Sequence, residues 1–186
     1  MHKPTPPANF PELTDAQLLR LVYSQWDFQQ ALSALIFLLE ECDFEERYSA
    51  IQLRRFRCYE SSIIISFARP FEVSRGKTAL GLKAIGIELS PSERQLRDRV
   101  MDLRRKVVAH SDEGAMHFKG VILQPFDDVG IKVPLFKFQE TLHLAQDDVR
   151  PLETLLRKLT HAIAAILFQL AQVSPERLEV YKAPAS

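Results

Sequence analysis

Apolar residues recur at helical intervals over long stretches at both ends of this chain. Spacings of three and four residues are typical of a helix that buries one face, and they strongly restrict the fold. The first such stretch runs to about Glu41, and a second ends at Pro70, because proline disfavours a helical conformation in the residue before it. The last stretch carries the strongest apolar face. The apolar positions are Leu18, Leu19, Val22, Trp26, Leu32, Leu35, Ile36 and Leu39, then Tyr48, Ile51, Phe56, Tyr59, Ile63 and Phe67, then Leu152, Leu155, Leu159, Ile163, Ile166 and Leu170.

Three capping patterns predict where helices begin. Thr14 with Gln17 and Asp43 with Glu46 each pair a capping side chain with an acidic or amide residue three positions later. Ser90-Pro91-Ser92-Glu93 adds proline at the first helical position. The first two patterns predict an antiparallel pair of long helices. The third predicts a helix from Pro91 to about His110.

The period changes after the third helix. Residues 116–126 and 131–138 are rich in β-branched and aromatic side chains, and Asp127-Asp128-Val129-Gly130 separates them. This predicts a β-hairpin, with a short third strand at 140–144. Asp148 is predicted to open the last helix. The expected fold is therefore mainly α, a four- or five-helix bundle with a β-hairpin inserted before the last helix.

Length and composition predict one domain. Residues 1–13 read as a Pro-rich arm, 14–173 as a single domain and 174–186 as a loose tail, while residues 78–89 are ambiguous. The two cysteines are too few for a disulfide scaffold, and both are expected to be buried or half-buried. Neither a secretory signal nor a membrane span is recognisable, so we expect a cytoplasmic protein without membrane contact. No metal-ligand spacing or cofactor motif is found.

Charge is distributed unevenly although the net charge is zero. Residues 1–50 have a net charge of −5, whereas residues 54–77 and 90–110 have net charges of +4 and +3. If the two basic segments share a face, that face attracts anions. The alternative is a set of separate, solvated helix faces.

Two arginines precede a histidine at the end of the predicted third helix. Arg104 and Arg105 stand six and five positions before His110 in the segment Leu103–Asp112. An arginine can hold a phosphate with a planar fork of donors, and a histidine can move a proton near neutral pH. On an ideal helix Arg104 and Arg105 lie about 120° and about 140° from His110, so one straight helix does not bring them together. The alternative role for His110 is to stabilise the helix C-terminus as a cation.

The Arg–His spacing and the Ala109-His110-Ser111-Asp112 ending resemble the HEPN superfamily of helical bundles, many of them RNases of toxin–antitoxin and phage-defence systems. The Arg69-Pro70-Phe71 stretch is also similar to HEPN-like chains. The resemblance implies a metal-independent endoribonuclease, a homodimer that joins Arg and His near its twofold axis, and an antitoxin partner. Many members carry Asn, Asp or His after the arginine, whereas Arg104 is followed here by Arg105 and Arg105 by Lys106.

The resemblance assigns a role to each candidate residue. His110 would act as general acid or base on the ribose 2′-hydroxyl of RNA, and Arg105 or Arg104 would hold the scissile phosphate. Four further bases would bind the RNA backbone, and solvated positions are the alternative for them: Lys106, Arg69, Arg75 and Lys77. The alternative function is a non-catalytic HEPN-like module that binds a protein partner or a nucleotide.

Overall fold

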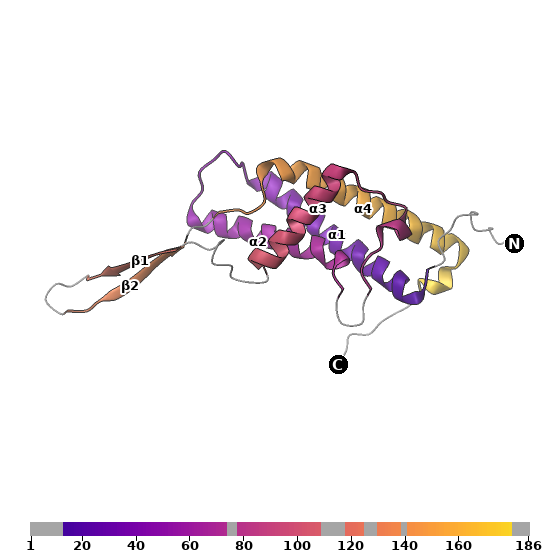
Figure 1. Ribbon diagram of the computed structural model, residues 1–186, viewed down its shortest axis with the longest axis horizontal. Coiled ribbons are helices and arrows are strands. Elements are labelled where there is room, and N and C mark those ends of the chain that lie inside the picture. The colour runs from indigo at the N-terminus through magenta and orange to yellow at the C-terminus, as the bar shows by residue number, and fades with distance from the viewer. Residues whose placement is uncertain (1–12, 74–77, 109–117, 125–129, 139–140, 180–186) are drawn as a thin grey trace.

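The fold was analysed in a computed structural model, which describes residues 13–73, 78–108, 118–124, 130–138 and 141–179. The described chain is mainly helical, and four α-helices and one two-stranded hairpin make up its regular structure (Figure 1). The α-helices are α1 (Asp15–Glu41), α2 (Ala50–Ala68), α3 (Pro91–Leu103) and α4 (Gln146–Val173). This confirms the mainly α fold with a β-hairpin before the last helix.

The longest helices, α1 and α4, run along the bundle together with α2 (Figure 1). Their facing sides form one hydrophobic core, which the segment around Ile85 to Leu89 and α3 extend. Phe28, Phe56 and Phe67 are among its fully buried side chains. Every apolar position predicted for α4 is buried: Leu152, Leu155, Leu159, Ile163, Ile166 and Leu170.

Local capping explains three of the four helix starts. Thr14 and Gln17 form the expected capping box of α1, and Ser90 and Glu93 form that of α3. The prediction that Asp43 and Glu46 open the second helix is wrong. That helix begins at Ala50 with a capping box of Ser49 and Gln52. The chain turns before it, because Asp43 accepts a hydrogen bond from the backbone N–H of Glu45 and donates its own N–H to the Tyr48 hydroxyl.

Two further boundaries differ from the prediction. The last helix starts at Gln146 with Ala145 at its N-cap, two residues before Asp148. After it, Pro175–Arg177 forms a 3-10 helix (η4), and Arg177 donates hydrogen bonds to the carbonyl of Leu13 and to Asp15. The segment after Val173 is therefore fastened to the start of α1 over its first residues.

The hairpin pairs β1 (Phe118–Leu123) with β2 (Val133–Phe138) in antiparallel register, with Phe118 opposite Phe138. Of its predicted turn, only Gly130 is described, and it has a positive φ of 65° that suits glycine. Residues 141–144 form no strand, so the predicted third strand is not found among them.

The two cysteines differ in exposure. Cys42 is buried as expected, but Cys58 is exposed.

Candidate functional site

The site lies along one side of α3. Arg94, Arg97 and Met101 are spaced three and four residues apart, which places them on one face of the helix, and Arg105 lies just beyond its end, in the segment Arg104–Val108. The segment 80–89 faces them. It contains the 3-10 helix η2 (Leu82–Ile85), which ends at Gly86, where φ is +65°. Leu80, Ile85, Ile87 and Leu89 of this segment are buried in the core, so the segment is fixed against the bundle.

Two adjoining cavities lie between α3 and this segment. The larger, of about 560 Å³, has Phe71, Met101 and Arg105 in its wall. The smaller, of about 340 Å³, has Glu88 and Arg94 in its wall. Three residues line both cavities: Leu82, Lys83 and Arg97. We call the two together the α3 groove.

Cations outnumber anions in the wall of the α3 groove. Lys83, Arg94, Arg97 and Arg105 line it, against Glu88 and Asp98. Arg97 donates two hydrogen bonds to Asp98, at 2.7 and 2.9 Å, and Arg94 donates one to the carbonyl of Leu89. The ammonium group of Lys83 has no hydrogen-bond or ion-pair partner among the described residues, while its backbone carbonyl accepts from the Gly86 N–H. Apolar contacts from Leu80, Leu82 and Met101 complete a groove suited to an anion with an apolar part.

Ion pairs to α4 fix the orientation of α3. Lys158 lies 2.9 Å from Glu93, and this hydrogen bond lowers the pKa of the Glu93 carboxyl. Arg99 forms a two-point ion pair with Asp148, whose hydrogen bond raises the pKa of Arg99. Both pairs tie α3 to α4. They thereby fix the orientation in which α3 presents Arg94 and Arg97 to the groove.

The basic end of the predicted third helix is wound differently from the α-helix expected there. Arg104–Val108 (η3) is a π-helix that packs against α2. Single π turns are rare and occur often at functional sites. His110 lies outside the described residues. The ideal-helix angles between His110 and the two arginines do not apply across this π turn, since its winding is wider than that of an α-helix.

The three basic residues of η3 have different surroundings. Arg104 is half-buried, and its Nε is shielded from solvent without a hydrogen-bond partner. Arg105 is exposed, lines the α3 groove and lies 3.1 Å from Asp102. An exposed pair of this kind contributes little stability, so a phosphate could replace Asp102 at low cost. Lys106 is exposed to solvent.

The loop predicted to hold phosphates contributes to the site mainly through Phe71. Arg69 is engaged with the buried carboxylate of Asp27 at 3.5 Å, while Arg75 and Lys77 lie outside the described residues. Phe71 packs against the ring of Phe67, and it lines the larger cavity together with Arg105. Phe71 of the loop and Arg105 therefore line the same cavity, but no described base of residues 54–77 lines it.

Sequence reasoning missed three cations of the groove. Lys83 fell in the ambiguous segment 78–89, and Arg94 and Arg97 were treated only as part of a basic helix. The three-residue spacing of Arg94 and Arg97 was a usable signal, because it places both arginines on one face of the helix. Among the described residues, no group of three or more His, Cys, Asp or Glu is placed to bind a metal ion. In the same part of the chain, no helix is both long and apolar enough to cross a bilayer.

Comparisons with known proteins add no relative: no family model, no curated protein and no solved structure matches this chain. The HEPN resemblance therefore rests on the sequence motifs alone.

Proposed function

We propose that this protein is a metal-independent endoribonuclease that binds RNA in the α3 groove and cleaves it with His110. The observation that carries the proposal is the set of Arg94, Arg97 and Arg105, which line one groove, and His110 follows Arg105 by five residues in the sequence. Arginine sets of this kind match the repeating negative charge of a nucleic-acid backbone. Phe71 at the groove wall offers an aromatic surface to a base.

In the proposed reaction, His110 takes the proton of a ribose 2′-hydroxyl. The 2′-oxygen attacks the adjacent phosphorus, and the bond from phosphorus to the 5′-oxygen breaks. The products are a 2′,3′-cyclic phosphate and a 5′-hydroxyl, whose oxygen takes a proton from solvent. Arg105 or Arg104 stabilises the charge that develops on the phosphate oxygens. The nucleophile belongs to the substrate, so DNA is not cleaved.

Two parts of the proposal come from the family resemblance. One is a second subunit that brings its own Arg–His motif to the site, in the dimer expected of this family. The other is an antitoxin protein that blocks cleavage in the cell. Lys106 and Arg69, with Arg75 and Lys77, are proposed as peripheral contacts to the RNA backbone.

The deciding experiment compares purified full-length chains on end-labelled RNA in the presence of EDTA. Replacing His110 by Ala is expected to slow cleavage roughly 10²–10⁴-fold, which is the usual contribution of general acid–base catalysis. His161→Ala is the matched control, since His161 is an exposed histidine on α4. Arg105→Lys is expected to impair cleavage too, because lysine has no planar fork.

The chemistry of the products separates this activity from a contaminating nuclease. RNA with 2′-O-methyl groups should resist cleavage, and the fragments should end in 2′,3′-cyclic phosphate. If folded His110→Ala cleaves as fast as the parent, the catalytic proposal is wrong. The protein would then be a non-catalytic binding module, the alternative that the sequence left open.

A further inference from the structure

The β1–β2 hairpin exposes an unusual amount of apolar surface. It projects from one end of the bundle (Figure 1), and each of its residues is exposed except Val121, which is half-buried. An isolated two-stranded hairpin is marginally stable in water, and exposed apolar patches of this kind mark interaction sites. The large apolar side chains exposed in this region are Phe118, Ile122, Leu123, Ile131, Val133, Leu135, Phe136 and Phe138.

Both faces of the hairpin are apolar. The register places Phe118, Phe136 and Phe138 on one face, and the Phe118 ring lies 5.9 and 5.7 Å from the other two. The opposite face carries Leu123 and Val133 near the turn, with Val121 and Leu135 beside them. Lys119 and Lys137 stand on this aliphatic face and not beside the three rings. The hairpin therefore does not combine cations with a stacking surface, as single-strand nucleic-acid sites do, and it suits a protein surface better.

The two strands of the hairpin are also basic. Lys119 and Lys137 are direct cross-strand partners, and Lys132 adds a third positive charge. The described residues 118–124 and 130–138 contain no acidic residue, and Asp127 and Asp128 stand between the strands in the sequence. Like charges directly opposite one another destabilise a sheet. The hairpin is therefore complementary to a surface that is apolar and acidic together.

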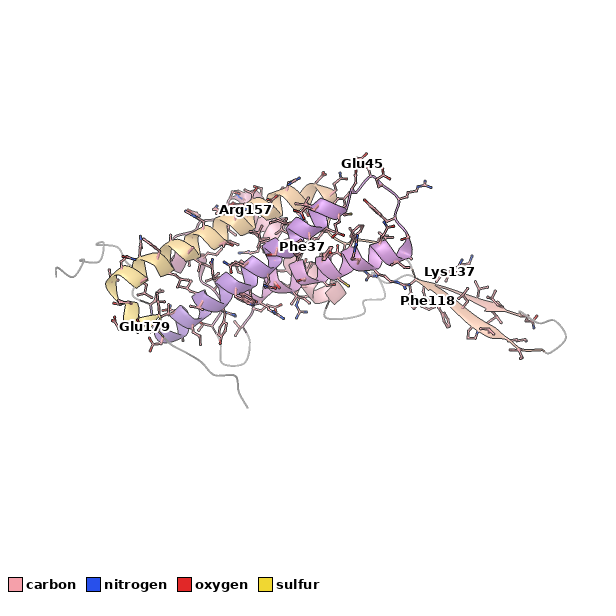
Figure 2. The ribbon with its side chains drawn as sticks, turned by 180° about the vertical axis from the view of Figure 1, so that it is seen from behind. Phe37, Glu45, Phe118, Lys137, Arg157 and Glu179 are labelled. Atoms are coloured by element: carbon pink, nitrogen blue, oxygen red, sulfur yellow. The ribbon has the colours of Figure 1, made fainter. Side chains whose placement is uncertain are left out.

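This chain has such a surface at the end of α1 and in the turn that follows. Glu40, Asp43, Glu45 and Glu46 are exposed there beside one exposed base, Arg47, and we call the four acidic residues the acidic end. Phe37, one helical turn before Glu40, is 49% exposed, and Ile51, at the start of α2, is 78% exposed. Figure 2 shows Glu45 at the same end of the bundle as Phe118 and Lys137 of the hairpin, with Glu179 at the opposite end.

We propose that the β1–β2 hairpin docks on the acidic end of a second copy of this chain, and that the second copy docks its hairpin in return. A twofold dimer requires two complementary patches on one molecule, each contacting the other on its partner. Here the hairpin and the acidic end lie at the same end of the bundle. Two copies that meet at this end therefore form both contacts together. Lys119 and Lys137 then face Glu45 and Glu46 of the other copy, and Phe37 and Ile51 pack against the apolar faces of the hairpin. This assembly does not depend on cleavage of RNA.

A charge-swap experiment on the full chain tests the reciprocal contact. One variant carries Lys119→Glu and Lys137→Glu, and the other carries Glu45→Lys and Glu46→Lys. Each variant alone opposes like charges in both contacts, so its dimer dissociation constant should rise at least about tenfold. Mixing the two variants restores opposite charges in both contacts. Light scattering should then show dimers in the mixture and monomers in each separate sample.

The controls separate docking from folding. Glu176→Lys with Glu179→Lys makes the same charge change at the opposite end and should leave the dimer unchanged. Phe118→Ser with Phe136→Ser should weaken the dimer without a change in charge, and far-ultraviolet circular dichroism should show an intact bundle in every variant. A parent chain that is monomeric at micromolar concentration overturns the proposal. So does a mixture of the two charge variants that stays monomeric. A third contrary result is a hairpin variant that loses RNA affinity while its dimer persists, which would assign the hairpin to nucleic acid.

Discussion

Glu60, on the buried side of α2, accepts a 2.7 Å hydrogen bond from the backbone N–H of Leu144, which lies just ahead of α4. The same carboxylate oxygen accepts a second bond from the N–H of His143. One side chain thereby fixes the chain where it returns from the hairpin to the bundle. Burial raises the pKa of Glu60, and the two N–H donors and Arg57 oppose that rise. Burial lowers the pKa of the neighbouring His143, and Arg57 acts in the same direction.

Replacing Glu60 by Gln should flatten the dependence of stability on pH. A carboxyl group with a raised pKa binds its proton more tightly in the folded chain than in the unfolded chain. The stability it contributes is complete below its ordinary pKa of 4.5 and is lost as pH rises through the folded pKa. The amide of the variant would keep an acceptor oxygen without the ionisation. Urea unfolding of parent and variant between about pH 4 and about pH 8 checks the difference in slope.

Replacing Glu60 by Leu separates the acceptor from the charge. The N–H of Leu144 is buried, and without Glu60 it has no acceptor. We expect a loss of about 1–3 kcal/mol in the free energy of unfolding at neutral pH, the usual cost of an unsatisfied buried donor. If Glu60→Leu were as stable as Glu60→Gln, the two hydrogen bonds would not be what holds this segment.

The N-cap of α2 gives a second prediction. Ser49→Ala removes the side chain that accepts from the Gln52 N–H and should cost about 1 kcal/mol of unfolding free energy. Asp43→Ala removes only a turn contact to Glu45 and should cost less. Denaturant midpoints of the two variants, compared under identical conditions, give the order. If Asp43→Ala cost more than Ser49→Ala, Asp43 and not Ser49 would be the residue that starts the second helix.

The α3 groove gives a prediction for RNA binding that does not require cleavage. Lys83→Ala and Arg97→Ala should each weaken binding of single-stranded RNA, and each should reduce the slope of log affinity against log salt by about 0.7 for every phosphate that the variant no longer neutralises. Fluorescence anisotropy over a salt series measures both effects. Arg157→Ala serves as the control, because Arg157 lies on α4, is held by Glu153 and lines neither cavity. Equal losses of affinity in all three variants would indicate a general charge effect instead of a groove.

Gly86 ends the 3-10 helix η2, whose Leu82 and Lys83 line the same groove. Its φ of +65° is costly for any side chain, although a Cβ there would meet no atom within 4 Å. Gly86→Ala should therefore lower the free energy of unfolding by about 1–2 kcal/mol through backbone strain alone. Thermal or urea unfolding of the parent and the variant measures this difference in free energy. Gly86→Asn should cost less, since asparagine tolerates the left-handed conformation, and an equal cost for both would point to a cause other than backbone strain.

The fold was predictable where local chemistry decides it. The capping boxes at Thr14 and Ser90 and the apolar face of α4 are complete within a few residues of sequence, and all are confirmed. The start of α2 was missed because Ser49 and Gln52 show the same pattern as Asp43 and Glu46. The contact of Tyr48 with Asp43 favours a turn over the earlier start.

The site was less predictable, because it depends on contacts between distant segments. The π turn at Arg104–Val108 packs against α2, and no local sequence pattern predicts this turn or its packing. The segment 80–89 forms one wall of the groove. Its two glycines interrupt the helical pattern, so the sequence did not predict that the segment packs into the core. Glu60 did leave a signal, since it lies four residues after Phe56 and three before Ile63 on the apolar face of α2. His110, the residue of most interest in the sequence, lies outside the described residues.

The pairing of α1 with α4 also determines when this protein can fold during its own synthesis. The first helix leaves the ribosome early, with Phe28 and Leu35 on a face that shares its core with α4. At ordinary rates of translation, on the order of ten seconds pass before α4 is complete. Until then that apolar face is open to chaperones and to neighbouring nascent chains, so yield in the cell should depend on how fast the last third of the chain is made.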